Sequence, residues 1–226
     1  MPFPWFHRHA RRRRRLLAQA PPGPVRDLLA TAPPRDGTPL TDLPLLAIDI
    51  ETTGLDPDQD QVLSVGFVPV DGRSIRLGGA AHAIIRADAS VGRSATIHGI
   101  TDDAVAAGLP LADVLERTLD ALTGRVLLAH FARIEVDFLT RACERTFGGT
   151  PLFTVVDTLT LGKQHLFRTR GAIPRGQLRL HALRERFGLP RYKAHDALVD
   201  ALACAELYLA LTAERGQRPL RQVRER

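Results

Sequence analysis

The chain has 226 residues, of which 44% are hydrophobic. This length supports one well-packed domain and is short for two of ordinary size. Its two cysteines, Cys143 and Cys204, form no Cys-x-x-Cys pair, so we expect buried thiols in a reducing cytoplasm and neither a disulfide framework nor a zinc site. No apolar run is long enough for a bilayer span or a signal peptide, which predicts a cytoplasmic protein without a membrane span.

The net charge of +6 is concentrated at the two ends of the chain. Residues 1–20 contain six arginines and no acid, and residues 212–226 contain five arginines and two glutamates. The residues between these ends therefore carry a net charge of −3. A polyanionic partner would be attracted mainly by the ends.

Residues 1–40 combine the arginine run with six prolines between Pro21 and Pro39. This composition favours extended, poorly packed chain, so we interpret 1–40 as a basic, proline-rich arm and linker. Residues 41–211 would form the folded domain and 212–226 a basic tail. An alternative for the arm alone is binding to a membrane surface through Trp5, Phe6 and the arginines.

The folded domain begins with three segments of strand pattern and continues mainly with helical ones. Strands are predicted at 45–51, 61–70, 74–86 and 125–129, and helices at 111–122, 133–147, 177–187 and 196–213. Strands followed by alternating helices and short strands indicate an α/β domain with a mixed sheet flanked by helices.

Two acids, Asp49 and Glu51, stand two positions apart in the first strand. Strand side chains alternate, so both carboxylates point to the face opposite Leu46, Ile48 and Ile50. Paired carboxylates repel each other unless a cation lies between them, and Mg²⁺ prefers such hard oxygen ligands. The alternative is that both acids end an edge strand in solvent.

A third candidate acid, Glu135, follows from the helix at 133–147. At about 100° per residue, Glu135 lies in the middle of an inward arc that also contains Phe138 and Leu139. Asp137 instead falls on the opposite, polar face with Arg133, Arg141 and Glu144. A carboxylate that points inward needs a cation or a hydrogen-bond network, and the alternative partner is a buried arginine.

The last helix carries a fourth acid, Asp200, on a segment that is apolar nearly all round. His195 precedes this helix and can reach the same site only from the loop or cap before it. Asp196 is well placed to be the N-terminal cap. A single histidine before a helix is usually structural, so its catalytic interpretation depends on the neighbouring residues.

Five ordered segments resemble the motifs of the DnaQ-like, DEDDh-type exonucleases, a family that includes the proofreading subunit of bacterial DNA polymerase III, ribonuclease T and oligoribonuclease. The segments are DIETTGL at 49–55, IHGIT at 97–101, AHFARIEVDFL at 129–139, VDTL at 156–159 and HDALVDA at 195–201. The resemblance covers roughly residues 45–210 and implies a ribonuclease H-like fold.

The resemblance also implies roles for individual residues. It makes Asp49, Glu51 and Asp200 ligands of two Mg²⁺ ions, for which Mn²⁺ could substitute, and His195 the general base. Glu135 stands at the position of the fourth ligand. A cradle and pocket for the terminal nucleotide would be formed by Thr52, Thr53, Gly54, Leu55, His98, Gly99 and Ile100.

The middle motif departs from the family pattern. The family usually has Ala-His-Asn-Ala-x-Phe-Asp, whereas this chain has Phe131 for the Asn, Ile134 for the Phe and Glu135 for the Asp. Charge is retained, but the extra methylene of glutamate moves the carboxylate and affects the expected metal geometry.

The resulting hypothesis is a metal-dependent 3′→5′ exonuclease that hydrolyses nucleic acid, with DNA favoured, to nucleoside 5′-monophosphates in proofreading or repair. Residues 158–184 contain no acid and six basic residues, which would suit a phosphate backbone: Lys163, Arg168, Arg170, Arg175, Arg179 and Arg184. The alternatives are an exoribonuclease and a non-catalytic nucleic-acid or polymerase-binding module. A DNA polymerase is a candidate partner, although no Gln-x-x-Leu-x-Phe-like clamp-binding segment is present; the oligomeric state stays open.

Overall fold

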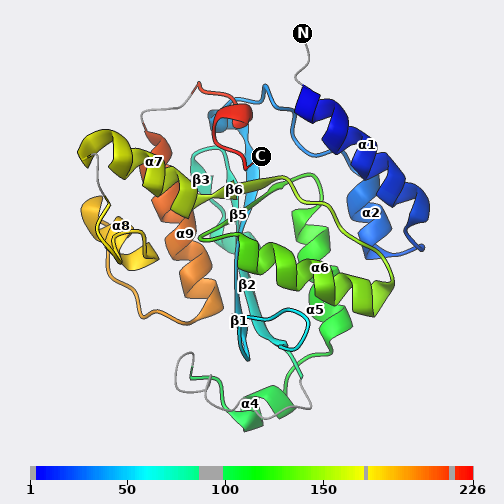
Figure 1. Ribbon diagram of the computed structural model, residues 1–226. Coiled ribbons are helices and arrows are strands. Elements are labelled where there is room, and N and C mark those ends of the chain that lie inside the picture. The colour runs from blue at the N-terminus through cyan, green and yellow to red at the C-terminus, as the bar shows by residue number, and fades with distance from the viewer. Residues whose placement is uncertain (1–3, 87–98, 171–172, 214–216, 226) are drawn as a thin grey trace.

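The computed structural model describes residues 4–86, 99–170, 173–213 and 217–225 of the protein (Figure 1). Helices and strands carry the labels of Figure 1. The helices are α1 (Pro4–Gln19), α2 (Pro24–Ala30), α4 (Asp102–Ala106), α5 (Leu111–Leu122), α6 (Arg133–Phe147), α7 (Thr158–Arg170), α8 (Leu180–Arg186) and α9 (Ala197–Thr212). The strands are β1 (Pro44–Thr52), β2 (Val62–Asp71), β3 (Ser74–Ile75), β4 (Ala81–Ile84), β5 (Val126–Ala129) and β6 (Val155–Asp157). Short 3₁₀ turns occur at Leu40–Asp42, Leu77–Gly79 and Leu220–Gln222.

One mixed sheet of six strands lies at the centre of the molecule, in the order β3-β2-β1-β5-β6, and β4 also pairs with β2. β1 is antiparallel to β2 and parallel to β5, and β5 is parallel to β6. The expected α/β domain with a mixed sheet is therefore confirmed. The single strand predicted at 74–86 is wrong, because the 3₁₀ turn at Leu77–Gly79 splits it into β3 and β4.

Helices cover both faces of this sheet (Figure 1). On one side, Leu46, Ile48 and Ile50 of β1 join an apolar core with α2, α5 and α6. On the other side, Leu45 and Ala47 join a second core with α7, α8 and α9. Because side chains alternate along a strand, the later residues Asp49 and Glu51 lie on the α9 side of β1.

The close approach of α9 to the sheet depends on Gly66 in β2, which pairs with Asp49 of β1. A Cβ atom at position 66 would collide with the backbone of Ala197 and Leu198 at the start of α9. A glycine inside a strand often marks such an approach of another backbone. Gly66 thereby allows the first turn of α9 to lie directly over the acidic end of β1.

The first 40 residues are not the extended arm that their composition predicts. α1 and α2 are helical, and Val25, Leu28 and Leu29 of α2 are buried in the core shared with α5 and α6. Pro24 begins α2 at a position where the missing N–H of proline removes no helical bond. Proline therefore starts a helix here instead of preventing one.

The C-terminal residues also pack on the domain. Leu220 and Val223 are buried in the core beside α9. Arg224 forms an ion pair of 2.7 Å with Asp36, and the backbone N–H of Glu225 donates to the carbonyl of Val155 at 2.8 Å. The C-terminal residues thus contact both the segment after α2 and strand β6. None of the helices in the described ranges is long and apolar enough to cross a membrane.

Candidate active site

The acids of β1 lie near its C-terminal end. Ile50, between Asp49 and Glu51, is buried in the opposite core, so the alternation of the strand sends both carboxylates toward α9. Asp49 is half-buried, and Glu51 is only 9% exposed. The alternative in which both acids end an edge strand in solvent is wrong, because β1 pairs with β2 on one side and β5 on the other.

The start of α9 brings in two further candidates. Asp196 caps the helix, as expected, and accepts bonds of 3.1 Å from the backbone N–H groups of Leu198 and Val199. His195, just before the cap, has a φ of 66°, in the left-handed region. Its backbone N–H donates to Oδ2 of Asp200 at 2.7 Å. The helix start therefore fixes the position of His195 relative to Asp200.

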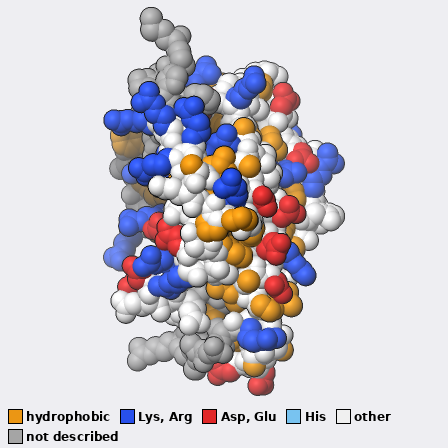
Figure 2. All heavy atoms as spheres, turned by 90° about the vertical axis from the view of Figure 1, so that its right-hand side faces the viewer, with side chains coloured by type: hydrophobic (Ala, Val, Ile, Leu, Met, Phe, Trp, Pro, Cys, Tyr) orange, Lys and Arg blue, Asp and Glu red, His pale blue; other side chains and the backbone are white. Residues whose placement is uncertain are grey.

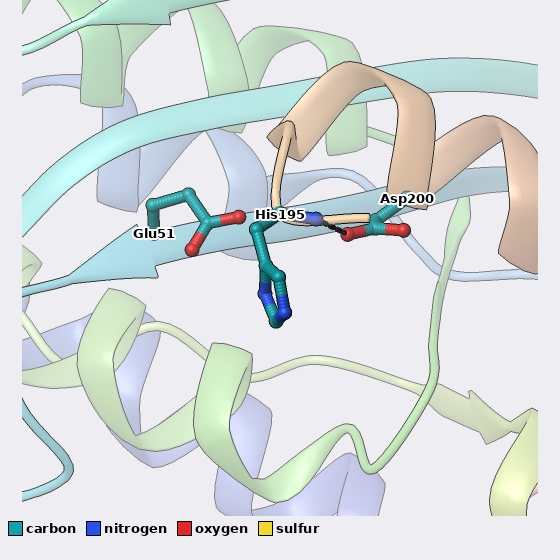
Figure 3. A group of neighbouring side chains, drawn as sticks. All are labelled: Glu51, His195 and Asp200. Atoms are coloured by element: carbon teal, nitrogen blue, oxygen red, sulfur yellow. Dashed lines mark hydrogen bonds between the residues drawn. The ribbon is translucent and has the colours of Figure 1, made fainter. Parts of the chain in front are cut away.

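Three of these residues meet at one point. One potential ligand atom each from Glu51, His195 and Asp200 lies within 4.8 Å of the other two. Figure 3 shows His195 between Glu51 and Asp200, with its imidazole below the two carboxylates in this view. Segments more than 140 positions apart in the sequence thus supply a histidine and two carboxylates with metal-ligand spacing.

Glu135 of α6 faces inward, as the helix projection predicts. It is 4% exposed, and its Oε2 is buried without a hydrogen-bond partner. Burial, together with the charge of Asp157, raises the pKa of Glu135 to about 8. A buried carboxylate in this position is strongly unfavourable as an anion unless a cation joins it.

The same electrostatic strain extends to the acids of β1. Burial and then the charges of Glu135, Asp200 and Glu51 raise the pKa of Asp49 well above its usual value. Burial and the charge of Asp200 raise the pKa of Glu51 to about 7. Asp49 therefore lies within the electrostatic field of the other three acids, and bound cations would relieve this repulsion.

Asp157 belongs to this region although the sequence analysis gave it no role. It ends β6 and accepts backbone bonds from Phe131 (2.9 Å), Ala132 (3.3 Å) and Leu159 (2.8 Å). Phe131 is 47% exposed and has a φ of 69°, so Asp157 holds an unfavourable backbone conformation at the entrance to α6. The VDTL motif contained this aspartate, but its partners become visible only when β5 and β6 lie side by side.

The residues expected to cradle a nucleotide form the turn after β1. Thr53 donates its hydroxyl to Asp60 at 2.9 Å, and the carboxylate of Asp60 lies so close to Gly54 that a Cβ there would collide with it. Leu55 is 79% exposed at the tip. The structure thus presents Thr52–Leu55 as a fixed turn directly after Glu51.

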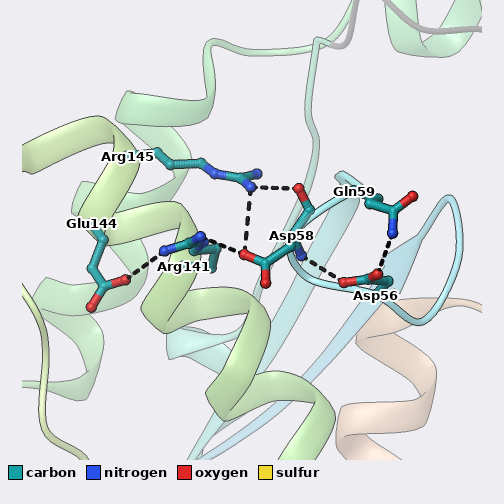
Figure 4. A network of polar contacts seen from close by, with 6 residues as sticks. All are labelled: Asp56, Asp58, Gln59, Arg141, Glu144 and Arg145. Carbon is teal, nitrogen blue, oxygen red and sulfur yellow. Dashed lines mark hydrogen bonds and ion pairs between the residues drawn. The ribbon is translucent and has the colours of Figure 1, made fainter.

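The same turn is attached to α6 (Figure 4). Arg141 forms an ion pair of 2.5 Å with Asp58, and Arg145 donates to the carbonyl of Asp58 at 2.6 Å. On α6, Arg141 also contacts Glu144 at 3.4 Å. The turn and the helix that carries Glu135 are therefore linked on the surface.

The second group of expected nucleotide contacts is less complete. Gly99 is exposed with a φ of 71°, and Ile100 packs against the small apolar cluster of Leu63 and Val105. His98 lies outside the described residues. The role of Gly99 and Ile100 as nucleotide contacts stays a prediction.

The basic residues between positions 158 and 184 differ in their exposure to solvent. Lys163, Arg168, Arg175 and Arg179 are exposed, and the side chain of Arg170 lies outside the described part of the structure. The loop between α7 and α8 is attached to the segment between β5 and α6, because Nε2 of His130 donates to the carbonyl of Leu178 at 2.9 Å.

Arg184 is different, and its expected contact with a phosphate backbone is wrong. It is 3% exposed, and its guanidinium forms an ion pair of 2.7 Å with Glu206. This pairing leaves it unavailable to a polyanion.

Comparison with known proteins identifies the family of the chain. A family model described as an exonuclease of the RNase T type matches residues 46–208. The chain belongs to this exonuclease family. The expected resemblance to DnaQ-like exonucleases is thereby confirmed, and the chain is an enzyme of the exonuclease class.

The sequence relatives include subunits and segments of bacterial replicative polymerases. The chain is 30% identical over 172 residues to the DNA polymerase III subunit epsilon of Treponema pallidum, covering 76% of this chain and 77% of that protein. It is 29% identical over 175 residues to the PolC-type DNA polymerase III of Thermotoga maritima, covering 77% of this chain and 12% of that protein. The chain thus corresponds to one small part of the PolC-type polymerases.

Solved structures confirm the expected ribonuclease H-like exonuclease fold. The zinc-bound complex of E. coli exonuclease I with single-stranded DNA has a TM-score of 0.67 at 21% identity, covering 78% of this chain and 42% of that one. The nuclease domain of 3′hExo, a DEDDh family member bound to rAMP, has a TM-score of 0.64 at 17% identity, covering 77% of this chain and 94% of that one. At these identities the likeness shows the fold.

Proposed function

We propose that this exonuclease is metal-dependent and degrades DNA from the 3′ end to nucleoside 5′-monophosphates. The observation that carries the proposal is the convergence of Glu51, His195 and Asp200 within 4.8 Å, beside Asp49 and the buried Glu135. The proposal takes its direction of degradation and its products from the DnaQ-like family.

The donor set fits magnesium. Four carboxylates supply hard oxygen atoms, and the buried Oε2 of Glu135 has no other partner. Asp49, Glu51, Glu135 and Asp200 would hold two Mg²⁺ ions, with Mn²⁺ as a substitute. When bound, such ions lower the pKa of a coordinated water and stabilise negative charge on a phosphate.

The chain itself supplies the proton acceptor and the substrate contacts. The bond that fixes His195 uses its backbone N–H, so the imidazole nitrogens stay available to accept a proton from a water molecule. The turn Thr52–Leu55 follows Glu51 directly and presents the exposed Leu55 as an apolar surface for the terminal nucleoside. Glu135 stands where the family usually has Asp, so one ligand side chain is longer but keeps its negative charge.

DNA is favoured as substrate by the relatives, which are named as DNA polymerase III proteins. Exposed arginines on α1 and exposed basic residues between α7 and α8 would contact the phosphate backbone without sequence preference. Figure 2 shows the face with α1 and α2, where basic side chains gather in the upper part and acidic ones lie lower and to the side. The relatives also make a polymerase a candidate partner, with proofreading or repair as the setting.

RNA is the second candidate substrate, and one observation favours it. The 3′hExo nuclease domain, which shares the fold, was solved with rAMP bound. Discrimination between the two polymers depends on contacts near the 2′ position.

The test is a digestion assay with purified protein and Mg²⁺ or Mn²⁺ on matched single-stranded DNA, duplex DNA and RNA, each labelled at the 3′ or the 5′ end. We expect a 5′-labelled ladder that shortens from the 3′ end, immediate release of a 3′ label as mononucleotide, and faster loss of DNA than RNA. Faster loss of RNA would favour the exoribonuclease. Binding without cleavage in either metal would indicate a non-catalytic module.

The His195→Ala variant is the internal control for the proposed chemistry. Hydrolysis should slow by roughly 10²–10⁴-fold with little loss of substrate binding, as expected for a general base. An equal loss of binding and turnover would instead make His195 a substrate contact.

A further inference from the structure

The buried Arg184 of α8 has four partners. Its Nη1 donates to the carbonyl of Ala203 at 2.7 Å, and its Nη2 donates to the carbonyl of Pro190 at 2.9 Å and to Oε2 of Glu206 at 2.7 Å. The guanidinium carbon also lies 4.6 Å from the centre of the Tyr192 ring. The arginine thus joins α8, the loop after it and α9.

Tyr192 and Glu206 complete a closed triangle around this arginine. The hydroxyl of Tyr192 donates to Oε1 of Glu206 at 2.9 Å, while Oε2 of the same carboxylate accepts from Arg184. Each of the three side chains therefore contacts both of the others. Ring and guanidinium face each other in the geometry of a cation–π contact.

The triangle contacts the segment that leads to His195. Between the end of α8 and the start of α9, the chain is attached to Arg184 at the N–H of Leu189, at the carbonyl of Pro190 and at the ring of Tyr192. Arg191 to Asp196 are otherwise exposed. Three residues after Tyr192 the chain reaches His195, whose left-handed backbone must be held by its surroundings.

We propose that Arg184, Tyr192 and Glu206 are positioning residues that hold the 189–195 loop so that His195 faces Glu51 and Asp200. Glu206 lies on α9, the helix that also carries Asp200, so the loop and the acid are fixed on the same element. Removing the cation would leave the half-buried carboxylate of Glu206 without its ion-pair partner and the loop without its central attachment. The effect on catalysis rests on the proposed exonuclease function.

The first test compares Arg184→Gln with Arg117→Gln, an equal change of charge at an exposed position on α5. Hydrogen exchange of the His195 amide, the single-turnover rate at saturating DNA and the DNA dissociation constant are measured for each, with circular dichroism to check folding. For Arg184→Gln we expect at least about 10-fold faster exchange, because the amide bond to Asp200 opens more often. The rate should fall by about 10- to 100-fold and the dissociation constant should change by less than about 2-fold. Arg117→Gln should match the wild type in all three.

Variants at Tyr192 keep the test valid if Arg184→Gln fails to fold. Tyr192 is 39% exposed on a loop, so its replacement leaves the core intact. Tyr192→Phe, which loses only the hydroxyl, should show a smaller increase in His195 exchange than Tyr192→Ala, which loses the ring as well. Wild-type exchange and rate in Tyr192→Ala would overturn the proposal, as would a change confined to the dissociation constant.

The exchange measurement separates this proposal from the proposed function. If the wild-type protein cleaves no nucleic acid, the proposed function fails, and unchanged exchange at His195 in Tyr192→Ala and Arg184→Gln then overturns the positioning role as well. Faster exchange in these variants supports the positioning role whichever substrate the enzyme takes.

Discussion

α6 and α9 begin with the same backbone arrangement, but the candidate metal ligands that they carry differ in their hydrogen bonds. Each helix is preceded by a non-glycine residue in the left-handed region, Phe131 with a φ of 69° and His195 with a φ of 66°. Each of these residues donates its backbone N–H to an aspartate, at 2.9 Å for Phe131 and Asp157 and at 2.7 Å for His195 and Asp200. Both helix starts are thus fixed by a carboxylate.

The two arrangements differ in which carboxylate does the fixing. At α9 it is Asp200, a ligand candidate, which therefore has a hydrogen bond before any cation binds. At α6 it is Asp157, while the candidate Glu135 is buried with an unpartnered oxygen. Burial raises the pKa of Asp200, but the His195 N–H offsets part of this cost, whereas the acid of α6 depends on a cation for its charge.

The largest expected effect is the loss of the charge on α9. Asp200→Asn keeps an oxygen that can accept the His195 N–H but removes the negative charge from the metal site. We expect turnover to fall by roughly 10³-fold or more, which corresponds to about 4 kcal/mol of transition-state stabilisation. The melting temperature of the metal-free protein should stay close to that of the wild type. Undiminished turnover would remove Asp200 from the site.

Glu135→Gln should show how Glu135 of α6 differs from Asp200 of α9. In this variant we expect activity to fall while the stability of the metal-free protein rises. Turnover should fall by roughly 10²–10³-fold, since a ligand charge is lost. In EDTA at pH 9 the variant should be more stable than the wild type by about 1–2 kcal/mol, because the buried anion is gone. Urea unfolding of both proteins with and without Mg²⁺ measures this.

Glu135→Asp is the matched control for that variant. It retains the charge with a shorter reach, so we expect retained activity with an altered preference between Mg²⁺ and Mn²⁺. If Glu135→Gln loses activity but is no more stable than the wild type without metal, the proposed difference between Glu135 and Asp200 is contradicted.

The pH dependence of stability provides a third test. The pKa values of Glu51 and Glu135, raised in the folded protein to about 7 and about 8 from the usual 4.5, mean that the folded state binds these protons more tightly than the unfolded state. Stability is therefore fully present below pH 4.5 for these groups and is lost as the pH rises through 7 to 8. In EDTA the free energy of unfolding should fall by a few kcal/mol, to order of magnitude, between about pH 5 and 9. Saturating Mg²⁺ should remove most of this slope, and a flat profile in EDTA would contradict the assignment.

Periodicity predicted the parts of this contrast that lie within single elements. The 100° projection placed Glu135 inward and Asp137 outward on a helix whose bounds agree with α6. Strand alternation placed Asp49 and Glu51 on one face. Both inferences depend only on local geometry, which explains why they succeed without knowledge of the fold.

The parts that sequence patterns missed depend on contacts between elements. Asp157 gains its role from the parallel pairing of β5 with β6, and Gly66 from the approach of α9. Arg184 looked like a surface cation because charge alone does not show that Glu206 would lie opposite it. The composition of residues 1–40 predicts extended chain because it counts prolines as helix breakers, whereas Pro24 starts α2.

A smaller effect is expected at the entrance to α6. Phe131→Asn places a residue that tolerates the left-handed region where a large aromatic residue now adopts it. Because Phe131 is 47% exposed, little burial is lost, and we expect stabilisation by about 0.5–1 kcal/mol in urea unfolding. Phe167→Asn is the control: Phe167 is 64% exposed within α7, where asparagine relieves no strain and should be neutral or destabilising. Equal effects at both positions would contradict the strain at Phe131.

The smallest expected effect is at Asp137, two residues from Glu135 on the same helix. Its ion pair with Arg133 is 3.3 Å long, and the two side chains are 45% and 82% exposed, so solvent screens the pair. Asp137→Asn should cost at most about 0.5–1 kcal/mol of stability and leave turnover and metal preference at the wild-type level. Digestion assays run in parallel with Glu135→Gln measure this directly. An inactive Asp137→Asn beside an active Glu135→Gln would mean that the chemistry follows the other face of α6, so that both the helix register and the family motif would be misplaced by two residues.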